Sequence, residues 1–253
     1  MKISVLTLFP ELIETIVASS VTGRALADGH FELETVQIRD FAGNRYGKVD
    51  DSLYGGGTGL LMQCEPVWQA WQSARSRMPA DARSIVLSPK GRVLDQALVD
   101  ELAAASGLIL ICGHYEGIDE RVLEAIGAEP VSLGDYVLTG GELGAAVLID
   151  AVSRQLPGVL PDESAWREES HIAGRLECRQ YTKPETWRGR GVPEVLRSGH
   201  HARIAAWRRL DGLAETLAYR PDLFCRLDLD EEELTLLWQH MEDRRQETGS
   251  HDD

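Results

Sequence analysis

The sequence predicts an α/β fold with a mostly parallel sheet, covered by helices on both faces and followed by a smaller helical domain. Up to about residue 155, short β-branched runs alternate with segments of helical length, a pattern typical of strands joined by crossover helices. After about residue 176 the strand pattern stops and helical periodicity remains. A chain of 253 residues has room for one large or two small domains.

The N-terminal part alternates strands and helices in chain order. We expect strands at residues 2–9, 31–38, 84–87, 108–111 and 130–133. We expect helices at residues 10–26, 66–76, 95–104, 119–126 and 142–155, the last with an almost wholly apolar first half that predicts burial. Residues 40–60 are predicted to form a long loop, and the turn at 88–91 is predicted to stop the third strand.

The C-terminal part is organised differently. Residues 157–176 mix Pro, Gly, Ser and charged residues without periodicity, which indicates a linker or mobile loop. Helices are predicted at 200–219 and 231–244, and residues 246–253 should fray. The first helix places one apolar stripe on one face: Ile204, Trp207, Leu210, Ala214 and Leu217. The predicted division is therefore a domain at 1–160, a linker at 161–176 and a helical domain at 177–253.

Composition places the chain among cytoplasmic proteins without a membrane partner. Hydrophobic residues make up 43% and charged residues 26%, as in ordinary globular proteins. The N-terminus does not look like a signal peptide, and no apolar run approaches the roughly 20 residues that cross a bilayer. Four widely spaced cysteines, without zinc-site spacing, are expected to be reduced thiols, and no metal site is predicted: Cys64, Cys112, Cys178 and Cys225.

Charge is distributed unevenly along the chain. The net charge of −15 argues at face value against a nucleic-acid partner. Residues 177–210, however, carry eight Lys or Arg against three Asp or Glu, between two acidic regions. Such a segment can contact phosphates, or it can be a solvated face whose arginines pair with neighbouring acids. Charge alone leaves both interpretations open.

Two glycine-containing loops follow apolar strands. They are CGHYEG at 112–117 and SLGDYVLTGGEL at 132–143. Because ligands of open α/β sheets bind at the carboxyl ends of strands, and glycine permits close backbone approach, these loops predict one small-molecule pocket lined largely by backbone.

Several residues in these loops have two interpretations. His114, Tyr115 and Glu116 could serve acid–base chemistry or form a buried structural trio, and Asp135 could be a base or a turn cap. The segment DSLYGGGTG at 51–59 could cradle a phosphate or be a plain glycine-rich turn, since it lacks a P-loop ending. The arrangements typical of hydrolases do not occur in the sequence.

Seven segments together resemble the bacterial tRNA (guanine-N1)-methyltransferase family of the SPOUT superfamily. They run in order from residue 1 to about 224: MKISVLTLFPE, DDSLYGGGTGLLM, LSPKGR, CGHYEGIDERV, SLGDYVLTGGELGAAVLIDAVSRQLPGVL, YTKPETWRGRGVPEVLRSGHHARIAAWR and RPDLF. The combination of CGHYEG with GDYVLTGGE is highly specific. The resemblance implies a deep trefoil knot, an obligate homodimer whose active sites use both subunits, and a tRNA rather than a DNA partner.

The resemblance also implies an S-adenosylmethionine site built from three loops. The matching residues are Leu87, Ser88, Pro89, Gly113, Tyr115, Glu116, Gly117, Ser132, Leu133, Gly134, Tyr136, Leu138, Gly140 and Gly141. The linker and the helical domain would bind tRNA, and the methyl acceptor would be N1 of the guanosine immediately 3′ of the anticodon. Basic residues of the helical domain are candidates for phosphate contacts: Lys183, Arg188, Arg190, Arg197, Arg203 and Arg208.

Guanine N1–H is a weak acid, so methyl transfer needs a base at N1 and a cation near O6. The resemblance gives the O6 role to Arg154; the plain alternative is a charge favoured by a helix C-terminus. The family's base is an aspartate, and the aligned residue here is Glu169, with Glu168 or Asp162 as alternatives beside a simply solvated acidic linker. The family also uses Mg²⁺, for which the sequence shows no cage.

Two other functions remain open at this point. One is a SPOUT methyltransferase that acts on a different RNA nucleotide, which the YTKP, VPEVLRSGHH and RPDL segments disfavour. The other is an RNA-binding protein that has lost catalysis, which the change to Glu169 favours and the intact cofactor loops disfavour.

Overall fold

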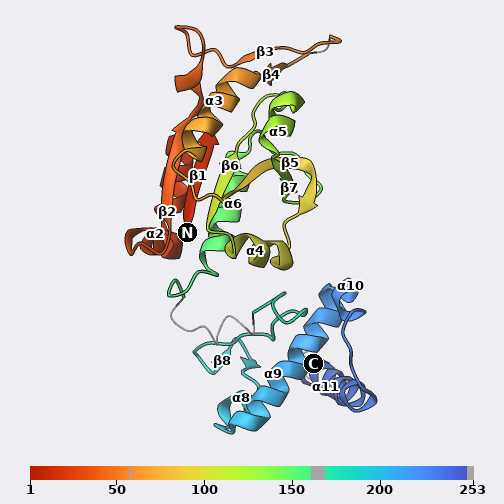
Figure 1. Cartoon of the computed structure of the whole chain (residues 1–253). Helices are drawn as coiled ribbons and strands as arrows, with labels where there is room; N and C mark the ends of the chain where they lie inside the picture. The colour runs from red at the N-terminus through yellow and green to blue at the C-terminus, as the bar shows by residue number, and fades with distance from the viewer. Residues whose placement is uncertain (57, 161–168, 250–253) are drawn as a thin grey trace. The chain divides into compact units, whose positions relative to one another are not determined.

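A five-stranded sheet forms the centre of the N-terminal unit in the computed structural model (Figure 1). The strand order is β2-β1-β6-β5-β7, and each neighbouring pair is parallel. The strands are β1 (Lys2–Thr7), β2 (Glu32–Gln37), β5 (Arg83–Val93), β6 (Gly107–Ile111) and β7 (Glu129–Ser132). The predicted α/β class with a mostly parallel sheet is confirmed.

The structure describes residues 1–56, 58–160 and 169–249. The chain divides into two units, Met1–Pro161 and Asp162–Asp253, and each is described by itself. No helix that the structure describes is both long and apolar enough to cross a membrane.

Helices cover both faces of the sheet, and its central strand β6 is buried at every position. In β6, Leu108 and Leu110 belong to one buried cluster, and Ile109 and Ile111 belong to the other. The first cluster packs against α1 (Pro10–Val17), α2 (Ser20–Ala27), α4 (Gln96–Ala103) and α6 (Glu142–Ser153). The second packs against α3 (Cys64–Arg75) and α5 (Glu120–Ile126). A strand buried on both sides shows no alternation in its sequence, as expected of a parallel sheet.

The helix expected at 10–26 is two helices. Helix α1 ends at Val17, and α2 begins at Ser20, whose φ of 56° lies in the left-handed region. The Ser19 hydroxyl donates a hydrogen bond to the carbonyl of Thr15, which satisfies the end of α1 locally. Serine side chains that bond nearby backbone favour such breaks.

Two further corrections concern loops. The expected long loop at 40–60 contains a 3₁₀ turn (Ile38–Phe41) and an antiparallel hairpin of β3 (Asp50–Ser52) and β4 (Leu60–Met62). Strand β5 does not stop at 88–91. It continues to Val93, and both Leu87 and Arg92 face Val131 of β7, so residues 88–91 form a bulge.

The C-terminal unit contains the two helices predicted for it. They are α9 (His201–Tyr219) and α11 (Glu231–Gly249), accompanied by the short helices α8 (Glu194–Arg197) and α10 (Pro221–Phe224). Helix α11 continues past the expected fraying point to Gly249, and the rest of that prediction lies outside the described residues. A small hairpin of β8 (Thr186–Trp187) and β9 (Arg190–Gly191) was not predicted, because two-residue strands show no periodicity.

Candidate functional site

A cavity of about 380 Å³ lies at the bulge of β5 and at the carboxyl ends of β6 and β7. It is formed by the β5 bulge and by the segments that follow β6 and β7. These segments meet because the carboxyl ends of parallel strands lie at the same edge of a sheet. The volume falls within the range of roughly 300–1,000 Å³ that is usual for small-molecule sites.

The structure brings all the sequence-predicted cofactor residues together at this cavity. They come from three separate segments and line one surface: Leu87, Ser88, Pro89, Gly113, Tyr115, Glu116, Gly117, Ser132, Leu133, Gly134, Tyr136, Leu138, Gly140 and Gly141. The lining also includes residues that the sequence analysis left out, among them Lys90, Glu120, Val137, Thr139 and Gly144. Asp135 is exposed and is not part of the lining.

Backbone geometry explains the glycines at this cavity. Gly117 and Gly134 adopt φ angles of 123° and 143°, which L side chains rarely adopt. At Gly141 the φ is ordinary, but a Cβ would lie 2.7 Å from the Cα of Cys112. Tyr115 adopts a φ of 60° without being glycine, so the loop after β6 carries local strain at a cavity residue.

A buried polar network supports the cavity from behind. The side chain of His114 lies 2.7 Å from Glu142 Oε2, and the Thr7 hydroxyl donates to Glu142 Oε1 at 2.6 Å. Glu142 is only 2% exposed, and the amide of His114 donates to the sulfur of Met62. The network joins the ends of β1 and β6 to the start of α6, so it fixes two of the cavity segments relative to the sheet.

Of the three residues predicted to form a buried structural trio or to serve acid–base chemistry at 114–116, only His114 takes part in this network. All three line the cavity, but His114 is half-buried and hydrogen-bonded to Glu142, whereas Tyr115 and Glu116 are exposed. Glu142 was not predicted as a site residue. Its signal in the sequence was a carboxylate at the start of an otherwise apolar helix, where a charge needs a partner to be buried.

The glycine-rich hairpin braces the same loop rather than standing alone. The amide of Glu116 donates to the carbonyl of Leu60 at 2.9 Å, and the amide of Met62 donates to the carbonyl of Gly117 at 3.0 Å. A Cβ at Gly59 would lie 2.5 Å from the Glu116 side chain. Residues 51–59 therefore fit the interpretation as a glycine-rich turn. Gly57 lies outside the described residues.

The pKa values of Asp119 and Cys112, near the loop after β6, are shifted away from their usual values. Hydrogen bonds from Arg121 hold the pKa of the Asp119 carboxyl well below its usual range, where it caps α5. Burial raises the pKa of the Cys112 thiol well above its usual value. A buried neutral thiol is a poor nucleophile, so Cys112 serves packing.

Arg154 does not line this cavity. It is the half-buried C-cap residue of α6, whereas Gly141 and Gly144 at the other end of that helix do line it. A helix of this length spans about 18 Å at 1.5 Å per residue. Within one subunit, the predicted O6 ligand is therefore a helix length away from the predicted methyl-donor site.

Glu169 lies in the C-terminal unit, at the start of a hydrogen-bonded turn. The amide of Ile172 donates to the carbonyl of Glu169 at 3.3 Å, and the amide of His171 donates to the carbonyl of Arg175 at 2.8 Å. Residues 169–176 thus contain hydrogen-bonded turns within the segment predicted as a linker or mobile loop. The alternative bases Glu168 and Asp162 lie outside the described residues.

The C-terminal unit exposes a set of basic side chains, called here the basic surface. The predicted phosphate-contact residues are all exposed: Lys183, Arg188, Arg190, Arg197, Arg203 and Arg208. Arg197 forms an ion pair with Glu185, and the Arg188 guanidinium lies 5.0 Å from the ring centre of Trp187. Arg197 therefore fits the interpretation in which the arginines of this segment pair with neighbouring acidic residues.

A metal cage made by protein alone does not occur in the described part of the chain. Within residues 1–56, 58–160 and 169–249, no three His, Cys, Asp or Glu side chains gather in a way that could hold an ion. The four cysteines are separate free thiols.

Comparison with known proteins gives a consistent result over nearly the whole chain. Residues 1–226 match the family described as tRNA (Guanine-1)-methyltransferase TrmD. A protein of Ruminiclostridium cellulolyticum named tRNA (guanine-N(1)-)-methyltransferase is 51% identical over 227 residues, 90% of this chain and 97% of its own length. Proteins with the same name from Shewanella oneidensis and Dehalococcoides mccartyi are 48% and 47% identical, over 96% and 94% of this chain and 98% and 96% of their own lengths. The family resemblance of the sequence is thereby confirmed, and the chain belongs to the tRNA (guanine-N1)-methyltransferase family.

Proposed function

We propose that this chain transfers a methyl group from S-adenosylmethionine to N1 of the guanosine immediately 3′ of the anticodon in tRNA. The observation that carries the proposal is the convergence of three distant segments on one cavity, with every residue expected to bind the cofactor among its lining. Membership of a methyltransferase family supports the reaction type.

The cavity suits the proposed cofactor. Its lining combines apolar side chains such as Leu87, Leu133 and Leu138 with the backbone of several glycines, a composition that suits a nucleoside with a short polar tail. When bound there, the cofactor supplies an electrophilic methyl group on a sulfonium centre. We infer that the segments surrounding it form the family's deep trefoil knot.

Glu169 and Arg154 have the chemistry that the guanine requires. Removal of the N1 proton by the Glu169 carboxylate makes N1 nucleophilic, and the Arg154 guanidinium stabilises the negative charge that develops on O6. Glutamate is one methylene longer than the family's aspartate, so its backbone must lie correspondingly farther from N1.

We infer that the active enzyme is a homodimer. Arg154 is a helix length from the cavity of its own subunit, so a second subunit is needed to bring a guanidinium to the methyl donor. Helices α1 and α6, which contact each other, expose large apolar residues of 38–51% relative exposure: Phe9, Leu12, Ile16, Leu143 and Val147. An apolar face of this kind on a folded domain indicates a subunit interface.

The basic surface of the C-terminal unit is proposed to hold tRNA. Exposed residues such as Lys183, Arg190 and Arg203 provide phosphate contacts. The target guanine must leave its stack, because its N1 is otherwise inaccessible. A required Mg²⁺ would have to be held mainly by RNA and water, since the described residues offer no cage. We expect the enzyme in the cytoplasm, where tRNA is available.

Methyl transfer to two transcripts tests the proposal. One tRNA carries guanosine 3′ of the anticodon and the other carries adenosine there, and both are incubated with Mg²⁺ and labelled S-adenosylmethionine. Label on the first alone, mapped to N1, is the expected result. Label on both transcripts would indicate a SPOUT methyltransferase with a different target nucleotide. Label on neither, with cofactor still bound, would indicate an RNA-binding protein.

A further inference from the structure

The segment that begins with Glu169 is attached to helix α9 by a chain of specific contacts. The first is a reciprocal pair between Ser170 and Glu177: the amide of Ser170 donates to Glu177 Oε1, and the amide of Glu177 donates to Ser170 Oγ, each at 3.1 Å. This pair, called here the Ser170–Glu177 clasp, closes the turn that starts at Glu169. Inside the turn, His171 adopts a φ of 74°, a strained conformation that needs support from surrounding contacts.

The next contacts join the end of the turn to α9. The amide of Leu176 donates to Thr216 Oγ1 at 2.9 Å, and Thr216 Oγ1 donates to the carbonyl of Gly212 at 2.6 Å. A Cβ at Gly212 would lie 2.9 Å from the carbonyl oxygen of Leu176. The backbone after the clasp therefore lies directly against α9, at a point where the helix has no side chain.

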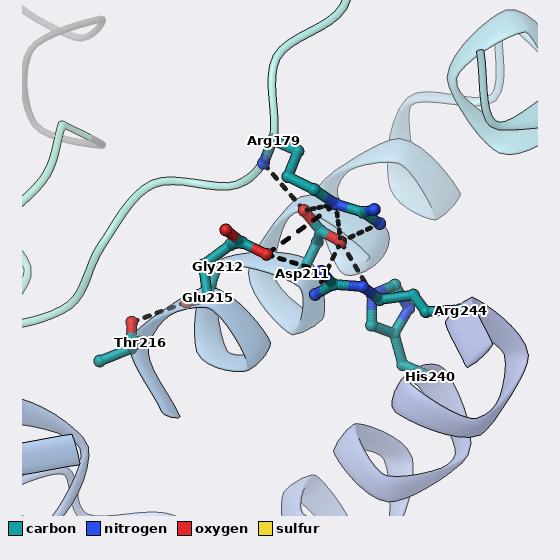
Figure 2. A network of polar contacts seen from close by, with 7 residues as sticks. All are labelled: Arg179, Asp211, Gly212, Glu215, Thr216, His240 and Arg244. Carbon is teal, nitrogen blue, oxygen red and sulfur yellow. Dashed lines mark hydrogen bonds and ion pairs between the residues drawn. The ribbon is translucent and has the colours of Figure 1, made fainter. Parts of the chain in front are cut away.

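A buried carboxylate completes the attachment (Figure 2). Asp211 is fully buried, and its Oδ2 accepts from the amide of Arg179 at 2.8 Å while Oδ1 accepts from the Arg179 guanidinium at 2.7 Å. His240 and Arg244 of α11 lie 3.1 and 3.5 Å from Oδ1. Although burial raises it, the hydrogen bonds from His240 and Arg179 hold the pKa of Asp211 below its usual range. The carboxylate is thus a fixed charge shared by the segment and two helices.

We propose that Glu177 and Asp211 are positioning residues for Glu169, fixing the turn that carries the base to helix α9, which also carries Arg203 and Arg208. The inference rests on the proposed function, because it takes Glu169 as the base. Its consequence is that tRNA seated on α9 and the base move as one body. The proton acceptor is then placed by the tRNA-binding unit.

Variants of Glu177 distinguish a role in positioning Glu169 from a role in binding tRNA. Glu177→Ala removes the acceptor for the Ser170 amide, whereas Glu177→Gln keeps an oxygen acceptor of the same length without the charge. Glu242→Ala, which removes an exposed carboxylate of α11 in the same unit, is the matched control. For each protein we would measure the single-turnover methyl-transfer rate at saturating tRNA, the Kd values for tRNA and for S-adenosylmethionine, and amide hydrogen exchange over residues 169–177.

We expect Glu177→Ala to lower the single-turnover rate about 10- to 100-fold, because small misplacements of a catalytic group have effects of this size. Exchange over 169–177 should rise, both Kd values should stay within about 2-fold, and Glu177→Gln and Glu242→Ala should behave like the wild type. Hydrogen exchange is measured without RNA or cofactor, so it reports on the clasp even where the proposed reaction fails.

Three results would overturn the inference. Faster exchange in Glu177→Ala with an unchanged rate would mean that the turn does not position the base. Unchanged exchange would mean that the clasp does not hold the turn. Loss of tRNA affinity with a normal rate at saturation would give Glu177 a binding role. A wild-type protein inactive on both transcripts would instead reject the proposed function, and the assignment of Glu169 with it.

Discussion

The cavity of the N-terminal unit and the Glu169 segment of the C-terminal unit are built by different physical means. The cavity in the N-terminal unit is shaped by backbone: left-handed glycines, a strand bulge and a helix start packed against a strand end. The Glu169 segment in the C-terminal unit is held by side chains, through the Ser170–Glu177 clasp and the buried Asp211. A cavity shaped by closely packed backbone tolerates few added side-chain atoms. A segment held by side chains depends instead on a few contacts made by charged groups. A substitution that disrupts the cavity should therefore leave the Glu169 segment intact, and a substitution that disrupts the segment should leave the cavity intact.

The largest effect is expected from Asp211→Ala. The substitution removes the buried carboxylate that Arg179 and His240 share. Removing one partner of a buried ion pair typically lowers the free energy of unfolding by about 3–5 kcal/mol. The free energy of unfolding of the C-terminal unit should fall by this amount in urea denaturation, and tRNA binding should be lost. S-adenosylmethionine affinity should be retained, because the cavity lies in the other unit. Asp222→Ala, which removes an exposed carboxylate paired with Arg220, is the control and should leave the unfolding curve in place. A parallel loss of cofactor affinity in Asp211→Ala would show that the two units are not independent.

A smaller effect, confined to the N-terminal unit, is expected from Gly141→Ala. The φ of −79° at this position suits any residue, so the 2.7 Å approach to the Cys112 Cα alone decides the outcome. Overpacking of this kind costs about 1–3 kcal/mol. S-adenosylmethionine affinity, measured by calorimetry, should fall while tRNA affinity stays the same. Gly43→Ala is the matched control, because a Cβ there meets no atom within 4 Å. Equal cofactor affinities in the two variants would mean that the close contact does not shape the cavity.

The acid dependence of stability in the C-terminal unit should depend on Asp211. The pKa of Asp211 is lower in the folded protein than the ordinary aspartate value of about 3.9. Its stabilising contribution is therefore complete above that value and is lost as the pH falls through the folded pKa. Urea denaturation between pH 5 and pH 2.5 should show the C-terminal unit losing stability below about pH 4. Asp211→Asn should lose less over the same range, and an identical slope in that variant would assign the acid sensitivity to other carboxylates.

The same distinction explains how far sequence reasoning reached. Strands such as β6 and loops such as 132–143 have local signatures, because apolar runs and glycines record backbone requirements position by position. These patterns therefore predicted a pocket at the loops 112–117 and 132–143, whereas the individual lining residues were implied by the family resemblance, and their role as a cofactor site remains a prediction. The pairing of Glu142 with His114, and of Asp211 with Arg179, joins residues 28 and 32 positions apart. No local pattern records such a partner, and an aspartate on α9 looks in the sequence like any solvated charge.

The smallest effect is expected from Lys183→Ala on the basic surface. Lys183 is exposed, so the substitution should not change the fold. Loss of one phosphate contact should weaken tRNA binding uniformly and reduce the slope of log Kd against log salt by about 0.7–0.9. Fluorescence titrations at several salt concentrations measure this slope, and Lys2→Ala on the N-terminal unit, where Lys2 pairs with Glu32, is the control. An unchanged slope would mean that Lys183 does not contact a phosphate of the tRNA. A reduced slope with an unchanged methyl-transfer rate at saturation would show that this surface supplies affinity, while the placement of Glu169 depends on the buried contacts beneath it.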